Sequence, residues 1–151
     1  MPATEPVVVR AMEARDVPAV VAIEEDAFTT PWHAETFLAL VGRPGHELLV
    51  CESPEGEIVA YAVVSIVLDQ AELANIAVRE DWRGRRIGSS FLDRILEKVR
   101  EREIRELFLE VRESNLVGRA LYEKRGFEEI GRRRDYYDAP REDALQLVKR
   151  F

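Results

Sequence analysis

The sequence predicts an α/β protein in which a mixed β-sheet is flanked by helices. The run Ile58–Leu68 is almost continuously apolar, which is typical of a strand covered on both faces. Residues 87–99 carry apolar side chains at helical spacing, with charged residues on the other side. In the second half of the chain, strand-like and helix-like patterns alternate, which favours strand–helix–strand crossovers after the hairpins of the first half.

The first half of the chain predicts strands that alternate with two helices. Asp16 is a residue type that caps helices, and Pro18 fits the first turn of a helix that runs to about Ala27. Thr30 and Pro31 form a second start signal, for a short helix that carries Phe37. The other expected elements are strands at Val7–Arg10, Leu48–Glu52 and Ile58–Leu68, with a tight turn at Pro54–Gly56.

The second half predicts the neighbour of the central strand, two further helices and the closing strands. Ser114 or Asn115 caps the second of these helices, and Gly126 ends it. The expected elements are strands at Leu73–Val78, Leu107–Val111, Glu128–Arg134 and Ala144–Val148, and helices beginning near Ile87 and Leu116.

Composition predicts a single globular domain over residues 1–151. Hydrophobic residues make up 46% and charged residues 34% of the chain, with no linker, repeat or low-complexity segment. The start MPATEP does not resemble a signal peptide and no apolar run is long enough to span a membrane, so we expect a cytoplasmic protein without a membrane partner. One cysteine and two histidines predict neither an internal disulfide nor a metal site.

The net charge of −7 is unevenly distributed along the chain. Residues 1–78 carry a net −10 and residues 79–151 a net +3. This asymmetry is compatible with an anionic cofactor on one side and a cationic partner on the other, or with an ordinary mixed-charge surface. Most arginines are interleaved with glutamates, which argues against a direct nucleic-acid interface.

The turn RGRRIG at residues 83–88 resembles a phosphate-binding loop. Gly84 and Gly88 let backbone N–H groups approach an anion, and the helix that begins near Ile87 directs its positive end to the same place. The spacing matches neither GxGxxG nor GxxxxGK, so we expect a polyphosphate-like ligand other than NAD or a P-loop nucleotide. The alternative is an exposed basic turn that only caps the helix.

Glu110 and Tyr122 are the candidates for proton transfer. Glu110 lies in the apolar strand LFLEV, where burial would raise its pKa toward that of a working base. The alternative is an outward-facing carboxylate that pairs with Arg112 or is solvated. Tyr122 lies on the following helix, where its phenol could donate a proton, or it could be a core tyrosine.

Other residues are candidates for an acceptor groove or for covalent catalysis. Cys51 ends an apolar run, which favours a small buried hydrophobe over a nucleophile. Acidic residues near residue 30 could attract a basic tail, namely Glu24, Glu25, Asp26 and Glu35. The aromatic and histidine candidates for substrate binding are Phe28, Trp32, His33, Tyr136 and Tyr137; each is equally compatible with packing, and for Trp32 packing is favoured.

Across nearly its whole length the chain resembles the GCN5-related N-acetyltransferases (GNAT), and more narrowly their RimI type. The motifs that carry the resemblance are PWHAETF at 31–37, ELANIAV at 72–78, RGRRIG at 83–88, LEVRESN at 109–115, ALYEKRGF at 120–127 and RRDYYDAPREDAL at 133–145. The resemblance implies a mostly antiparallel mixed sheet whose fourth and fifth strands splay apart to admit acetyl-CoA.

The resemblance also implies roles for individual residues. Glu110 would be the proton acceptor and Tyr122 the general acid. The cofactor would be held by Ile76, Ala77, Val78, Arg83, Gly84, Arg85, Arg86, Ile87, Gly88, Ser89 and Asn115. Arg86 stands where the family motif has a glycine; if that position requires a positive φ, arginine is strained there by about 1 kcal/mol or more.

The function implied by the resemblance is acetylation of a basic protein N-terminus, the alanine of small-subunit ribosomal protein eighteen, by direct attack on acetyl-CoA. A modest base suffices, because the pKa of an α-amine is about 7.7 to 8.0, roughly 2.5 units below that of lysine. The alternatives are a small-molecule amine or lysine acetyltransferase of the same fold and a non-catalytic acyl-CoA binding module.

Overall fold

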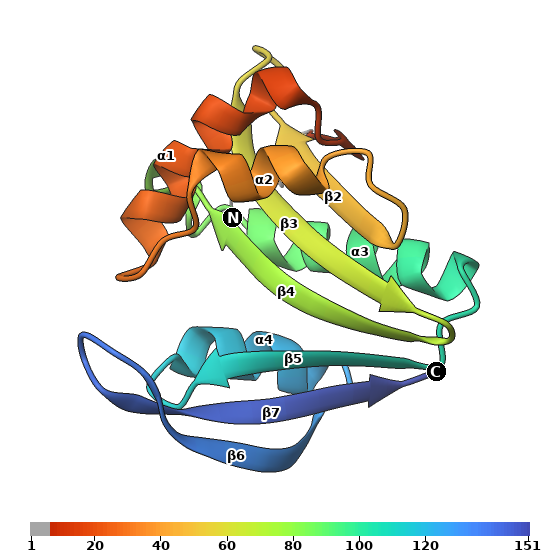
Figure 1. The fold of residues 1–151 in the computed structure, drawn as a ribbon, viewed down its shortest axis with the longest axis vertical. Helices are drawn as coiled ribbons and strands as arrows, with labels where there is room; N and C mark the ends of the chain where they lie inside the picture. The colour runs from red at the N-terminus through yellow and green to blue at the C-terminus, as the bar shows by residue number, and fades with distance from the viewer. Residues whose placement is uncertain (1–6) are drawn as a thin grey trace.

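The computed structural model describes residues 7–151, whose seven strands form one mixed sheet (Figure 1). The segment MPATEP lies outside the described residues. The strands are β1 (Val8–Ala11), β2 (His46–Glu52), β3 (Ile58–Val67), β4 (Gln70–Val78), β5 (Glu106–Arg112), β6 (Glu128–Tyr137) and β7 (Glu142–Arg150). The helices are α1 (Val17–Ala27), α2 (Ala34–Leu40), α3 (Ile87–Glu101) and α4 (Leu116–Lys124), with 3-10 turns η1 (Ala14–Asp16) and η2 (Glu80–Trp82).

The strand order is β1-β2-β3-β4-β5-β7-β6, and every neighbouring pair is antiparallel except β4 and β5. The predicted mixed sheet is therefore confirmed. The crossover through α3 joins the parallel pair β4 and β5, as expected. The helix α4 leads instead to the edge strand β6, because β7 pairs with β5 and separates it from β6.

The parallel strands β4 and β5 pair only at their beginnings, from Gln70–Glu72 and Glu106–Phe108. Both strands lie wholly within the described residues, and beyond these positions they no longer pair. Figure 1 shows them diverging toward their carboxyl ends. A bulge in β4 leaves Ala74 as an extra residue between partners of β3 and bends the strand at the same place. The predicted splay is thus confirmed.

The sheet is buried on both faces by two clusters of side chains. Alternate residues of β3 point in opposite directions, with Ala60, Ala62 and Val64 packed toward α3, and Tyr61 and Val63 packed toward α1 and α2. The helix α3 buries one face against the sheet, as predicted, through Ile87, Phe91, Leu92, Ile95 and Val99. Within residues 7–151, no helix is long and apolar enough to cross a membrane.

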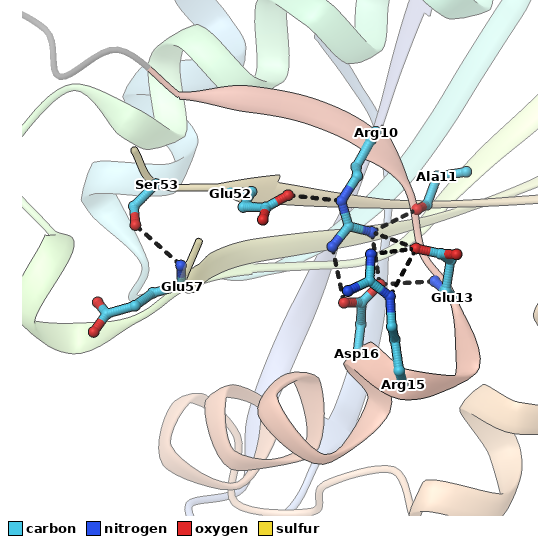
Figure 2. Close-up of polar contacts among 8 residues, drawn as sticks. All are labelled: Arg10, Ala11, Glu13, Arg15, Asp16, Glu52, Ser53 and Glu57. Atoms are coloured by element: carbon cyan, nitrogen blue, oxygen red, sulfur yellow. Dashed lines mark hydrogen bonds and ion pairs between the residues drawn. The ribbon is translucent and has the colours of Figure 1, made fainter. Parts of the chain in front are cut away.

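Asp16 occupies the N-cap position of α1, as the sequence predicts, but its carboxylate makes no capping hydrogen bond to the helix. Its carboxylate accepts hydrogen bonds from Nη1 and Nη2 of Arg10 at 2.8 and 2.9 Å and from the backbone N–H of Glu13 at 2.8 Å (Figure 2). These hydrogen bonds lower the pKa of Asp16, and those from Arg10 have the largest effect. Because Arg10 also contacts Glu52 at 2.8 Å, the network fastens the start of α1 to β1 and β2.

The short helix α2 begins at Ala34, later than Thr30 and Pro31 predict. The backbone N–H of Trp32 donates a hydrogen bond to the carboxylate of Glu24 at 2.9 Å. The segment between α1 and α2 is therefore held against α1 in a non-helical conformation, and His33 becomes the residue that precedes the helix. A tertiary contact has overridden the local start signal.

Candidate active site

The turn between β4 and α3 has the geometry of an anion-binding loop. Gly84 and Arg86 both have positive φ, at +79° and +63°, and Arg86 directly precedes α3. The first backbone N–H groups of α3 have no acceptor within the helix, and they gather at the end where the helix dipole is positive. The left-handed conformation at Arg86 confirms the expected strain at this position, which a glycine would not suffer.

The arginines of the turn are anchored to its surroundings. Nε of Arg83 donates to the carbonyl of Val78 at 3.0 Å, and its guanidinium lies 3.6 Å from Asp26. The guanidinium of Arg85 lies 4.6 Å from the centre of the Trp82 ring. The Val78 carbonyl is thus already engaged, which leaves Ile76 and Ala77 as the better candidates for main-chain contacts with a cofactor.

The first turn of α3 is tied to the end of α4 through Arg125. Its Nε lies 2.7 Å from Asp93, and its Nη2 donates to the hydroxyl of Ser89. Gly88, which precedes Ser89, has open space beside its Cα. A Cβ there would make only an ordinary contact with the Val78 side chain, at 3.7 Å. The predicted cofactor residues Arg83–Ser89 are therefore gathered at one end of α3.

Asn115 lies across the splay at the start of α4. Its Oδ1 accepts a hydrogen bond from the backbone N–H of Gly118 at 2.9 Å, which confirms it as the predicted helix cap. A Cβ at Gly118 would lie 2.6 Å from Nδ2 of Asn115, so only glycine leaves room for this cap. The diverging strands, the loop and the capped helix are the elements between which the family resemblance expects the cofactor.

Glu110 lies on β5 on the side opposite the buried Leu109 and Val111. Its Oε1 is 3.4 Å from Nε of Arg133, and its Oε2 is buried without a hydrogen-bond partner. Burial raises the pKa of Glu110, the charge of Arg133 lowers it and the charge of Glu72 raises it. The alternative pairing with Arg112 is wrong, because Arg112 pairs with Glu142 at 3.2 Å.

Tyr122 is 8% exposed and packs edge-on against Phe127, with ring centres 5.5 Å apart. Burial raises its pKa to about 12, so the phenol keeps its proton near neutral pH. Tyr137 links the two candidates: burial and the charge of Glu110, with smaller contributions that include Tyr122, raise its pKa to about 12. The structure therefore places Glu110 and Tyr122 each within electrostatic reach of Tyr137.

The other predicted acceptor residues lie on two loops. Trp32 packs against Phe37 with ring centres 5.5 Å apart and is half-buried, whereas His33 is exposed at the start of α2. Tyr136 and Tyr137 lie at the end of β6 with ring centres 5.1 Å apart. The loops touch where the hydroxyl of Thr29 donates to the carbonyl of Asp138 at 3.2 Å.

Cys51 is fully buried in β2, and burial raises the pKa of its thiol to about 11. A thiol in this environment stays protonated and has no access to a ligand. The prediction that Cys51 is a small buried hydrophobe is therefore confirmed, and the expected route is direct attack without a cysteine intermediate.

Glu24 is buried, so the prediction that it belongs to an acidic surface near residue 30 is wrong. Only 1% of it is exposed, and its carboxylate accepts hydrogen bonds from Nδ2 of Asn75 at 2.6 Å, from the Tyr61 hydroxyl and from the Trp32 backbone. The helical spacing does indicate burial, because residue 24 shares a helix face with Val17 and Val20, but the prediction did not take this spacing into account. The network connects α1 to β3 and to the bulged part of β4.

Comparison with known proteins gives a consistent result. Residues 17–127 match a family model described as the Acetyltransferase (GNAT) family. The ribosomal protein bS18-alanine N-acetyltransferase of Escherichia coli (strain K12) is 36% identical over 142 residues, covering 93% of this chain and 95% of that protein. The protein of the same description from Salmonella typhimurium is 37% identical over 136 residues, covering 88% and 90%.

A solved structure extends this likeness to three dimensions. The crystal structure of the ribosomal-protein-S18-alanine N-acetyltransferase from Escherichia coli superposes with a TM-score of 0.90 at 33% sequence identity. The match covers 96% of this chain and 94% of that chain.

Proposed function

The chain belongs to the GNAT family of acetyltransferases, and we propose that it transfers the acetyl group of acetyl-CoA to the amine of a protein N-terminus. The acceptor that we propose is the N-terminal alanine of ribosomal protein bS18, which the names of its relatives give for those proteins. With such an acceptor the enzyme works in the cytoplasm, as a single domain over residues 1–151.

The residues of the splayed region fit acetyl-CoA. The N–H groups at the start of α3 and the arginines of the turn would hold its pyrophosphate, at Arg83, Gly84, Arg85, Arg86, Ile87, Gly88 and Ser89. Backbone groups of Ile76 and Ala77, on the unpaired edge of β4, would contact its pantetheine arm, with Asn115 on the far side. The expected contact at Val78 falls to its other atoms, because its carbonyl accepts a hydrogen bond from Arg83. When bound, acetyl-CoA supplies an acetyl thioester, and the proton transfers fall to side chains of the chain.

Glu110 accepts the proton of the attacking amine in this proposal. Its raised pKa makes it a stronger base than an ordinary carboxylate, and Oε2 has no hydrogen bond to give up when it takes a proton. Tyr122 donates a proton to the sulfur of the departing thiolate, since its raised pKa keeps the phenol protonated. The single observation that carries the mechanism is the buried carboxylate oxygen Oε2 of Glu110, which has no hydrogen-bond partner.

A protein N-terminus suits this pair better than lysine does. The pKa of an α-amine is about 7.7 to 8.0, so a substantial fraction is unprotonated near neutral pH without further help. The pKa of a lysine side chain is about 10.4, and its deprotonation would require a stronger base or a desolvating pocket. The acceptor residues Trp32, His33, Tyr136 and Tyr137 line the two loops beside Glu110 in this proposal.

The decisive experiment offers the purified protein and acetyl-CoA two peptides and follows acetylation by mass spectrometry. One peptide begins with the N-terminal alanine of bS18, and the other has the same sequence with a blocked N-terminus and one lysine. We expect acetyl transfer only to the free N-terminus, with the Glu110→Gln variant as the control for enzyme-dependent transfer.

The other results would favour the alternative functions. Labelling of the blocked peptide would identify a lysine acetyltransferase. Labelling of neither peptide, with coenzyme A still raising the Tm, would contradict the proposal and indicate a small-amine acetyltransferase or a non-catalytic binding module. Turnover with a polyamine or an aminoglycoside separates these two.

A further inference from the structure

Arg112 lies on β5 two residues beyond Glu110 and holds the segment that joins β6 and β7. Its Nη1 donates to the carbonyl of Pro140 at 3.0 Å and lies 3.2 Å from Oε1 of Glu142. Its Nη2 donates to the carbonyl of Asp138 at 3.1 Å. One guanidinium thus satisfies two carbonyls of the loop and the side chain that begins β7, with only 24% of its own side chain exposed.

The same guanidinium also reaches the other acceptor loop. Nη2 of Arg112 donates to Oγ1 of Thr29 at 3.2 Å, and the Thr29 hydroxyl donates to the carbonyl of Asp138 at 3.2 Å. Thr29 lies between α1 and α2, whereas Asp138 lies between β6 and β7. The three residues form a closed triangle of hydrogen bonds, which we call the Arg112 clamp.

The clamp lies where the sheet itself provides no connection. The strands β4 and β5 stop pairing after Glu72 and Phe108, and Figure 1 shows the α1–α2 segment and the β6–β7 hairpin tip on the side toward which they diverge. The clamp therefore joins the β1–β4 part of the molecule to the β5–β7 part at the open end of the splay.

The clamp also contacts Tyr137, which lies near the proton-transfer residue Glu110. The Arg112 guanidinium lies 4.4 Å from the centre of the Tyr137 ring, and Tyr137 lies within reach of the charge of Glu110. Only arginine presents a planar fork of five donors, which is what several acceptors and an aromatic face at one point require.

We infer that Arg112 is a positioning residue that fastens the α1–α2 and β6–β7 loops together and so preforms the acceptor site. The inference rests on the proposed function for the identity of the acceptor. With the clamp intact, the acceptor meets two loops that are already ordered. Without it, the acceptor must order them on binding, which weakens its affinity. Glu110, Tyr122 and the acetyl-CoA loop keep their own contacts, so the effect falls on the KM for the acceptor.

The test uses Thr29→Val, Arg112→Gln and their double variant in the full chain. Thr29→Val removes one corner of the clamp without changing the shape of an exposed side chain. We expect it to raise the acceptor KM about threefold to tenfold, because the two hydrogen bonds of the Thr29 hydroxyl are exposed and each contributes little. Arg112→Gln should raise it by about tenfold or more, with kcat and the KM for acetyl-CoA unchanged. Arg112→Lys, which keeps the charge but not the fork, should fall between wild type and Arg112→Gln.

The double variant separates a shared clamp from two independent contacts. If the bonds act as one unit, Thr29→Val costs less in the Arg112→Gln background than in wild type, because only its bond to Asp138 remains to be lost, whereas fully additive effects would overturn the inference. The matched control is Arg132→Gln, because Arg132 lies on the same hairpin and forms ion pairs at 2.9 Å with Asp143 of β7 and with Glu113, which follows β5. We expect its acceptor KM to equal that of wild type.

Hydrogen exchange keeps the inference testable without any activity. The amides of residues 136–139 and of Arg141 should exchange faster in Thr29→Val and Arg112→Gln than in wild type and Arg132→Gln. If no peptide is acetylated but this difference appears, the proposed acceptor is wrong and the clamp stands. If peptides are acetylated while exchange and acceptor KM stay unchanged, or if kcat falls at constant KM, the clamp is overturned.

Discussion

Glu110 and Arg133 form a long, one-sided ion pair, in which one carboxylate oxygen lies 3.4 Å from the guanidinium and the other is buried without a partner. The carboxylate is therefore only partly compensated for the loss of water, and its pKa is raised by burial despite the nearby positive charge. A group left in this state is costly for stability and suited to accepting a proton.

Replacing Glu110 tests its role as the base. Glu110→Gln should lower kcat about 100-fold to 10,000-fold, the usual contribution of a general base, because the amide cannot accept the proton. Coenzyme A affinity, measured by calorimetry, should stay unchanged, since Glu110 lies outside the phosphate loop. An unchanged rate from about pH 6 to pH 9 would remove Glu110 from the mechanism.

Replacing Arg133 tests the electrostatic balance at Glu110. The positive charge of Arg133 lowers the pKa of Glu110, so Arg133→Gln should raise that pKa further. The base is then protonated over a wider range at low pH, and the acidic limb of the kcat/KM profile should move to higher pH with the plateau retained. The control is Arg134→Gln, because the charge of Arg134 acts on Asp143. A limb that stays in place, or moves to lower pH, would contradict this assignment.

The sequence predicts those elements in which the spacing of apolar residues matches the face that is buried. The apolar run Ile58–Leu68 and the helical spacing of Ile87 to Val99 correspond to β3 and α3, because burial against the sheet has the same period as the side chains. The predicted start of α2 is wrong because the backbone of Trp32 is held by Glu24, and local sequence signals give no information about this tertiary contact.

The candidate site shows the same limit. The turn RGRRIG and Glu110 could be found in the sequence, since a glycine-rich basic turn and a carboxylate in an apolar strand are unusual locally. The partners of Arg112 could not, because Thr29 lies 83 residues away and approaches only when the loops fold together. The strand position offered one signal, since residues 110 and 112 share a face.

Two substitutions at Gly88 test the anion-binding loop. A Cβ at Gly88 makes only an ordinary contact with Val78, so Gly88→Ala should keep the fold and weaken coenzyme A binding only by the bulk that it adds beside the anion. Gly88→Asp places a negative charge at the same point and should weaken binding about tenfold or more by repelling the pyrophosphate.

The same variants separate binding from folding. An aspartate in the first turn of α3 interacts favourably with the helix dipole, by about 0.3 to 1 kcal/mol. The Tm of Gly88→Asp should therefore equal or exceed that of Gly88→Ala while its coenzyme A affinity is lower. Equal affinities of the two variants, measured by calorimetry, would mean that the phosphates bind elsewhere.

The buried Glu24 should stabilise the fold by accepting hydrogen bonds from buried donors rather than through its charge. Glu24→Leu fills the space but leaves the Trp32 N–H and the Asn75 amide without an acceptor, at a cost of roughly 1 to 3 kcal/mol for each. Glu24→Gln should lose much less, because its oxygen can face the Trp32 N–H while the Tyr61 hydroxyl and the Asn75 amide turn to accept from its NH₂ group. Urea unfolding measures both losses, and equal stability of Glu24→Leu and wild type would contradict this role. Since Trp32 begins the segment that leads into α2, Glu24→Leu should also raise the acceptor KM, whereas Glu24→Gln should not.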